Sequence, residues 1–133
     1  MHILLDTHIA LWSLYDDTKL SKEAYDLIND LNNFIYFSAI SVMEVSIKHK
    51  KFPDTFTKSG ETFYSNCLKS DYLTMPFKPK HAIFMDKLNL KDGFIHNDPF
   101  DRALLAQAKQ ERFIFLSHDH MFENYKENFI MIV

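Results

Sequence analysis

Acidic residues recur in this sequence at places where they could act together on one ion. Asp6 and Asp119 each follow an apolar run, and Glu44 lies about one helical turn into the segment after another; Asp98 and Asp101 open a predicted helix. Oxygen ligands without Cys or His at metal-binding spacing suit a hard cation, Mg²⁺ or Mn²⁺, which keeps water ligands and engages phosphate. Such ions can orient and deprotonate a water molecule and neutralise the leaving oxygen during displacement at phosphorus. The acids therefore predict phosphodiester chemistry if the fold brings them together.

Each acid taken alone also has a structural interpretation. The segment Ser41-Val42-Met43-Glu44 fits a capping box at a helix start. Asp98 and Asp101 fit an N-cap and a first-turn acid of a helix. Asp6 and Asp119 could be turn residues at strand ends. We favour convergence, because chance gives little reason for an acid after every strand-like run that precedes a good helix.

Four polar residues beside these acids are candidates for supporting or substrate-binding roles. Thr7 and Ser117 carry hydroxyl groups next to predicted ligands, where they could donate hydrogen bonds that orient carboxylates. His96 could touch a phosphate or transfer a proton, although a polar loop histidine is the simpler interpretation. Arg102 could pair with a substrate phosphate or with a neighbouring acid.

Composition narrows the function classes. The 133 residues suit a single domain, 1–133. Only two glycines occur, Gly60 and Gly93, so neither a P-loop nor a dinucleotide fingerprint can be assembled. The single Cys67 can form neither an internal disulfide nor a cysteine zinc site, which indicates a reducing, cytoplasmic setting. No apolar run reaches about 18 residues and no basic leader is present, so we expect no membrane association.

The net charge of −3 means that any contact with RNA must use a local basic patch. Lys48, Lys50 and Lys51 are one candidate for such a patch. Cations are also favoured at a helix end without any substrate, so the structural interpretation stays open.

Apolar runs alternate with segments of helical spacing along the chain. Strands are predicted at residues 2–5, 34–37, 72–75, 113–116 and 129–133, and helices at 20–31, 41–51, 56–68, 84–88 and 98–110. Residues 6–8, 89–97 and 117–119 are predicted loops. This alternation predicts a three-layer α/β/α sandwich with a mostly parallel central sheet. Ligands of such sheets bind beyond the carboxyl ends of the strands, where the acids lie.

Four motifs in this order resemble those of PIN-domain proteins, above all the VapC-like toxins of type II toxin–antitoxin systems. They are Leu4–His8, Ser38–Glu44, His96–Arg102 followed by Ala106–Ala108, and Leu116–Asp119. The resemblance implies an endoribonuclease dependent on Mg²⁺ or Mn²⁺, a homodimer, and inhibition by a cognate antitoxin protein. By that likeness the catalytic and metal-binding acids are Asp6, Glu44, Asp101 and Asp119, with Asp98 as an additional metal ligand.

Three departures from the family pattern bear on specificity. Met43 stands where Trp is frequent, Ser117 stands where Thr is usual, and the loop before Asp98 is slightly longer. None of these departures removes an acid. They leave the choice of RNA and the fit to an antitoxin open.

Two phosphotransferase families also place an Asp at the end of the first strand. A haloacid-dehalogenase-type phosphatase needs a second acid two residues after the first, where this sequence has His8. A response-regulator receiver needs paired acids near the first strand and a Lys after a late strand, which Ser117-His118-Asp119 does not supply. The alternative that remains is a catalytically silent PIN-like module that acts only through protein partners.

Overall fold

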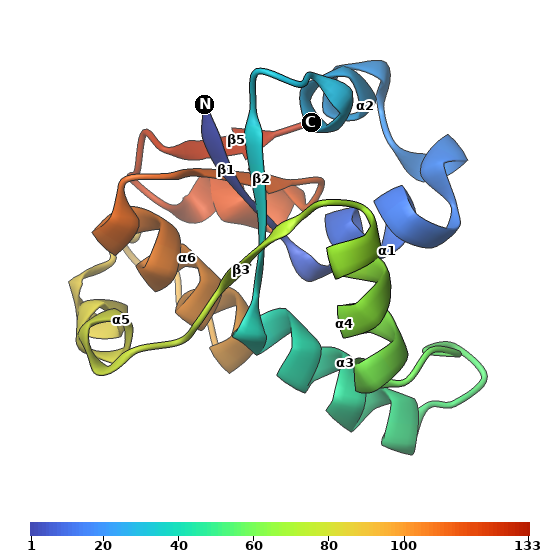
Figure 1. Ribbon diagram of the computed structural model, residues 1–133. Coiled ribbons are helices and arrows are strands. Elements are labelled where there is room, and N and C mark those ends of the chain that lie inside the picture. The colour runs from blue at the N-terminus through green and yellow to red at the C-terminus, as the bar shows by residue number, and fades with distance from the viewer.

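Five parallel strands form the centre of the computed structural model, which describes residues 1–133. The strands are β1 (His2–Leu5), β2 (Phe34–Ser38), β3 (Leu73–Met75), β4 (Ile114–Ser117) and β5 (Ile130–Ile132). They lie in the order β3-β2-β1-β4-β5, and every neighbouring pair is parallel (Figure 1). All five carboxyl ends therefore meet at one edge of the sheet. The five strands correspond to the five predicted runs.

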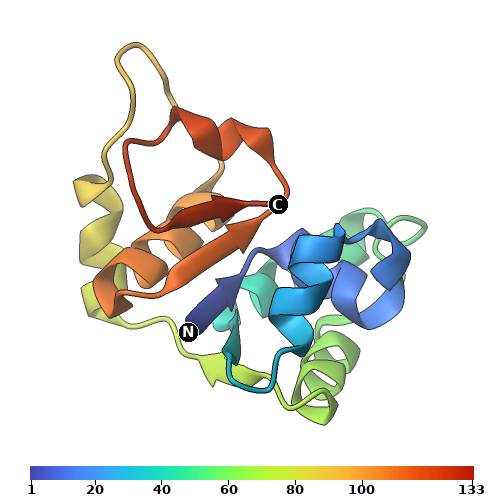
Figure 2. The ribbon, with the colours of Figure 1, turned by 90° about the horizontal axis from the view of Figure 1, so that it is seen from above.

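Helices cover both faces of the sheet. The α-helices are α1 (Thr7–Tyr15), α2 (Lys22–Asn29), α3 (Ala39–Lys51), α4 (Gly60–Lys69), α5 (Pro79–Phe84) and α6 (Pro99–Glu111). Three 3₁₀ helices join them: η1 (Asp17–Lys19), η2 (Met85–Lys87) and η3 (His120–Asn124). Viewed from above, α1 and α6 lie on opposite sides of the strands (Figure 2). The predicted three-layer α/β/α sandwich is confirmed. No helix is both long enough and apolar enough to cross a membrane.

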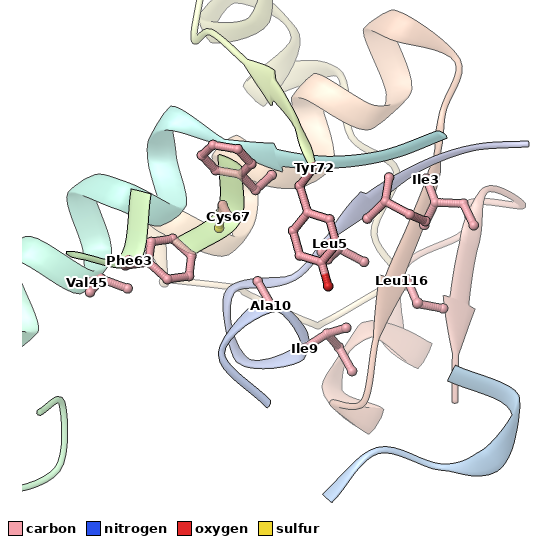
Figure 3. Close-up of a cluster of buried hydrophobic side chains, with 11 residues drawn as sticks. Ile3, Leu5, Ile9, Ala10, Val45, Phe63, Cys67, Tyr72 and Leu116 are labelled. Carbon is pink, nitrogen blue, oxygen red and sulfur yellow. The ribbon is translucent and has the colours of Figure 1, made fainter. Parts of the chain in front are cut away.

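Successive side chains of β1 point into two different cores. Ile3 and Leu5 pack with α1, α3 and α4 in one cluster, which Figure 3 shows in close-up. Leu4 packs with α6 and η3 in the other cluster. All three side chains are fully buried. A strand that is covered on both faces has to be apolar at every position, which explains why the sequence shows a continuous run rather than alternation.

The first difference from the predicted elements lies directly after β1. Residues 6–8 are no loop, because α1 begins at Thr7 with Asp6 as its N-cap. The Asp6 carboxylate accepts a hydrogen bond from the Thr7 amide at 2.8 Å. The hydrophobic periodicity gave no signal for this helix, because its own apolar residues are distributed over almost every side.

The second difference concerns the start of α3. Ser38 rather than Ser41 caps the helix, and its hydroxyl accepts a hydrogen bond from the Ile40 amide at 2.9 Å. Glu44 therefore lies in the second turn of α3, too far along for a capping box. The structural interpretation of Glu44 as a capping residue is wrong.

The third difference concerns the helix predicted at 56–68. It begins only at Gly60, and Phe56 lies in the preceding loop. Gly60 marks a close crossing of α4 over α3, since a Cβ atom here would come within 1.8 Å of the Ser46 hydroxyl oxygen. The crossing fixes the base of the 52–59 loop beside α1 and α3. The helix predicted at 84–88 lies earlier in the chain, because α5 spans Pro79–Phe84 and only a 3₁₀ turn, η2, follows it.

Candidate active site

All five predicted acids belong either to segments that follow the three central strands, β2, β1 and β4, or to the start of the helix before β4. Asp6 follows β1, Glu44 lies in α3 after β2, and Asp119 follows β4. Asp98 and Asp101 begin α6, which leads into β4. The Asp101 carboxyl lies in the electrostatic field of the other four acids, each of which raises its pKa. The fold therefore brings all five acids to one region.

Asp6 is the most buried of the strand-end acids, with 5% of its surface exposed. Its Oδ2 accepts a hydrogen bond from the Ser117 hydroxyl at 2.7 Å. Burial raises the pKa of Asp6 to about 6, and Glu44 adds to the rise, while the Ser117 hydroxyl and His8 oppose it. The same Ser117 oxygen accepts the Asp119 amide at 3.1 Å. One hydroxyl on β4 thus links the backbone of one acid to the carboxylate of another.

Glu44 is buried to 3% exposure and has one cationic partner. The Lys48 ammonium donates to its Oε2 at 2.5 Å, whereas its Oε1 has no hydrogen-bond partner. A buried carboxylate oxygen without a partner is costly, so a native structure rarely retains one without a functional reason. The sequence alone had made Lys48 a candidate for contact with RNA. The spacing of Glu44 and Lys48, four residues apart in a helix, is the signal that indicates their pairing.

The pKa of the Asp101 carboxyl departs further from its usual value than that of any other acid in the site. Burial and the four surrounding carboxylates raise its pKa to about 8. His96 Nε2 lies 3.2 Å from its Oδ2, and His96 Nδ1 lies 2.5 Å from the Tyr125 hydroxyl. Burial lowers the pKa of His96, which favours the neutral ring. A neutral ring satisfies both contacts by accepting from Tyr125 and donating to Asp101.

No sequence pattern indicated a role for Tyr125. His96 is buried rather than an exposed loop residue. The two residues are 29 positions apart, and no local pattern indicates that they meet. An isolated antiparallel bridge between Leu90 and Tyr125 ties the 88–97 segment to η3 and brings the two rings together. Burial raises the pKa of Tyr125 to about 12, so its hydroxyl stays protonated.

Asp98 and Asp119 both act as N-caps. Asp98 Oδ1 accepts the amides of Phe100 at 2.9 Å and Asp101 at 3.2 Å, as the sequence predicted. Asp119 Oδ1 accepts the Met121 amide at 2.9 Å and caps η3. Asp119 is exposed, so one face of the acid region is open to solvent.

Two of the predicted supporting residues contact other groups than expected. The Thr7 hydroxyl is hydrogen-bonded to the Ser41 hydroxyl at 2.8 Å and holds the start of α1 against α3. Arg102 forms no ion pair with any of the acids, and its Nε is buried without a hydrogen-bond partner. Its positive charge instead lowers the pKa values of His96 and Tyr125.

The five acids lie close to one another, but their carboxylates do not converge on a single point. No three His, Cys, Asp or Glu side chains converge closely enough to hold one ion. Three of the acids each contact a different side chain: Asp6 contacts Ser117, Glu44 contacts Lys48, and Asp101 contacts His96. The donor set still fits a hard cation, because it is made of carboxylate oxygens, one of which is buried without a partner. Burial is the main cause of the raised pKa of Asp101, and the four neighbouring carboxylates add negative charge that a cation would neutralise.

Known proteins resemble the chain both in sequence pattern and in fold. The sequence matches the PIN domain family over residues 3–128. The fold is similar to that of a chain in the crystal structure of VapBC2 from Rickettsia felis bound to a DNA fragment from their promoter. That comparison has a TM-score of 0.72 and 18% sequence identity, over 99% of this chain and 98% of that chain. No curated protein matches the sequence.

Proposed function

Because this chain belongs to the PIN domain family, we propose that it is a metal-dependent endoribonuclease that acts as the toxin of a toxin–antitoxin pair. The observation that carries the proposal is the state of Asp101, whose carboxyl is partly buried among four other acids and has a pKa raised to about 8. A fold gains no stability from such crowding. Perturbed carboxyls at the carboxyl edge of a parallel sheet are instead typical of functional sites.

Asp6, Glu44, Asp101 and Asp119 would hold Mg²⁺ or Mn²⁺, with Asp98 as an additional ligand. A bound divalent ion lowers the pKa of water and stabilises charge that develops on phosphate oxygens. The chain's own residues prepare the acids for this role. Ser117 fixes the Asp6 carboxylate, and Lys48 fixes Oε2 of Glu44 while Oε1 stays free. His96, held by Tyr125, orients Asp101.

Substrate binding would use the open side of the site. Asp119 is exposed there, so an RNA phosphate can reach the acids from solvent. Arg102 supplies a positive charge close to His96, with its Nε unpaired, and is our candidate for a contact to the phosphate. Such positioning and charge neutralisation account for most of the catalysis in phosphoryl-type displacements.

We further propose that a cognate antitoxin protein inhibits the enzyme and that two copies associate. The similar chain from Rickettsia felis belongs to a VapBC2 complex. This chain also exposes large apolar side chains that protein partners could cover, among them Ile83, Ile95 and Leu31. An RNA substrate and a single reduced Cys67 fit action in the cytoplasm.

A second candidate function is a binding module without catalysis. One observation favours it: no three acids converge on a common point. Such a protein would bind its partners through the same surface but leave RNA intact.

Cleavage of a short, end-labelled, single-stranded RNA separates the two functions. The expected result is endonucleolytic cleavage with Mn²⁺ or Mg²⁺, abolished by excess EDTA and restored when the metal is added back. An Asp101→Asn preparation purified in parallel controls for a contaminating nuclease. Cleavage that continues undiminished in EDTA would refute the metal-dependent mechanism. Intact RNA under all conditions, from a folded protein, would favour the binding module.

A further inference from the structure

A cavity of about 380 Å³ opens between α1 and the loop at 52–59, on the same side of the sheet as α3. Aromatic side chains form much of its wall: Trp12, Tyr15 and Phe56, together with the imidazole of His8. The volume lies within the roughly 300–1,000 Å³ that small-molecule sites occupy. It suits one compact group better than an extended peptide.

The rings in this cavity are arranged to receive a flat group. The His8 ring centroid lies 6.2 Å from that of Trp12 and 6.2 Å from that of Phe56, with interplanar angles of 44° and 53°. Neither contact is a parallel stack, and all three rings line the cavity. Exposed aromatic faces of this kind bind nucleobases by stacking, whatever the base, since every base has a π face.

Two lysines, Lys19 and Lys58, line the cavity although the chain as a whole carries −3. Residues 48–58 contain four lysines and a single acid, Asp54. Lys58 Nζ lies 5.3 Å from the ring centroid of Tyr15, and Lys19 lines the rim. The one acid that lines the cavity, Asp16, is paired with Lys19 at 3.8 Å. This local excess of lysine is complementary to the phosphates that flank a bound base.

Two residues connect the cavity to the acids. Lys48 Nζ donates to Glu44 Oε2 and also lies 5.4 Å from the ring centroid of Phe56. His8 lines the cavity and lies two residues after Asp6 in the sequence. A chain of nucleotides with one phosphate at the acids would therefore have a neighbouring base at the cavity.

We propose that this cavity is a nucleobase subsite, in which one base of a single-stranded RNA stacks against Trp12, His8 and Phe56 next to the phosphodiester held at the acids. The inference rests on the proposed function, since it names where that substrate binds. Stacking discriminates poorly between bases, so the subsite selects single-stranded RNA rather than a sequence. In a duplex the base would be paired and could not enter.

Trp12 is the chain's only tryptophan, so its fluorescence reports directly on the cavity. We would titrate the intact protein in EDTA, where no cleavage occurs, with an eight-nucleotide single-stranded RNA. The expected result is saturable quenching of Trp12. An abasic oligonucleotide of the same length keeps the phosphates and should quench much less.

Matched variants separate stacking and charge from general effects. Phe56→Leu keeps apolar bulk but removes the ring, and Lys58→Ala removes one cation; each should weaken RNA binding by about tenfold. The controls Tyr25→Leu and Lys69→Ala change exposed residues outside the cavity and should bind as the parent does. Melting temperatures establish that all four variants are folded, and Lys58→Ala keeps the test valid if Phe56→Leu unfolds.

Three results would overturn the subsite. The abasic oligonucleotide could quench as strongly as RNA, or the cavity variants could bind RNA as the controls do. Alternatively, the fluorescence of Trp12 could stay unchanged with RNA and change with an apolar helical peptide. The last result would assign the cavity to a protein partner. Failure here is distinct from failure of the proposed function. Metal-dependent cleavage without any response of Trp12 in EDTA overturns only the subsite. Base-dependent quenching in EDTA, with RNA that stays intact when Mn²⁺ is added, supports the subsite and refutes the nuclease.

Discussion

The two ends of helix α6 each carry an acid, and the two acids are in opposite electrostatic states. Asp101, in the first turn, is crowded by four carboxylates, and with its burial they raise its pKa to about 8. Glu111, the last residue of the helix, accepts from His81 Nε2 at 2.8 Å and Lys80 Nζ at 3.0 Å. The His81 hydrogen bond and the Lys80 ammonium hold the pKa of Glu111 below its usual range.

The helix itself would give the reverse order. Its macrodipole stabilises an anion at the N-terminus and destabilises one at the C-terminus, by typically 0.3–1 kcal/mol. Burial and neighbouring carboxylates outweigh that contribution at Asp101, and the His81 and Lys80 contacts outweigh it at Glu111. Glu111 is placed where its charge supports the fold by joining α5 to α6. Asp101 is placed where its charge opposes the fold, which is the distinction between a structural acid and a candidate catalytic one.

The largest expected effect is on activity. Asp101→Asn should lower the rate of Mn²⁺-dependent RNA cleavage by about a hundredfold or more, because it removes charge that stabilises the transition state through the ion. We expect the same of the amide variants of Asp6, Glu44 and Asp119. Glu111→Gln, at the other end of α6, should cleave within about twofold of the parent. Equal losses for Asp101→Asn and Glu111→Gln would remove the distinction between the two ends.

The second effect is on metal-linked stability. An ion that binds only the folded state stabilises it by about 2.7 kcal/mol at 100 times its Kd. Added Mn²⁺ should therefore raise the melting temperature of the parent and of Glu111→Gln by the same several degrees, and that of Asp101→Asn by much less. The measurement is a thermal melt with and without Mn²⁺ after treatment with EDTA. An equal shift for all three proteins would mean that the ion binds elsewhere.

The third effect is an opposite pH dependence of the two ends in EDTA. The folded-state pKa of Asp101 is raised from 3.8, so its contribution to stability is fully present below about pH 4 and is lost as the pH rises toward 8. The melting temperature of Asp101→Asn at pH 7 to 8 should consequently equal or exceed that of the parent. We expect the same of Asp6→Asn and Asp119→Asn, because Asn preserves their capping role. The pKa of Glu111 is lowered, so its contribution is present above about pH 4.5 and is lost at lower pH.

Melting curves of the parent, Asp101→Asn and Glu111→Gln from pH 3 to 9 test this pair of signs. The stability advantage of Asp101→Asn should grow with rising pH. The stability deficit of Glu111→Gln should shrink as the pH falls below 4.5. If Asp101→Asn instead lowers the melting temperature throughout, the acid is a structural one like Glu111.

The cap at the N-terminal end of α6 was predictable from the sequence, whereas the ion pairs at its C-terminal end were not. Asp98 followed by Pro99 is a local signal for a helix start, and the helix begins there. The partners of Glu111 lie 30 residues earlier in α5, and no local pattern relates them. The same contrast holds for the acids, since their positions after apolar runs are local, whereas the contact of His96 with Tyr125 depends on tertiary structure. Helix α1 was missed because its apolar residues are spread around the helix and give no amphipathic pattern.

A smaller effect concerns the cap of α6. Asp98→Ala should lower the free energy of unfolding by about 0.5–2 kcal/mol, because the amides of Phe100 and Asp101 lose their acceptor. Asp98→Asn keeps an acceptor and should cost much less stability. It should also reduce cleavage less than Asp101→Asn does. Urea unfolding of both variants measures the cap, and a large activity loss for Asp98→Asn at unchanged stability would make Asp98 a principal metal ligand.

The smallest expected effect is at the opposite cap. Arg112 ends α6 in the left-handed region, at φ 61° and ψ 43°, where a side chain costs about 1–2 kcal/mol and glycine costs almost nothing. Glycine also loses more conformational freedom on folding, by about 0.5–1 kcal/mol, which offsets part of that gain. Arg112→Gly should therefore raise the free energy of unfolding by up to about 1 kcal/mol, measured by urea unfolding. Cleavage should be unchanged, because this end of the helix lies away from the acids. A stabilised variant with reduced cleavage would show that the two ends of α6 are coupled, and the separation between a structural end and a catalytic end would then fail.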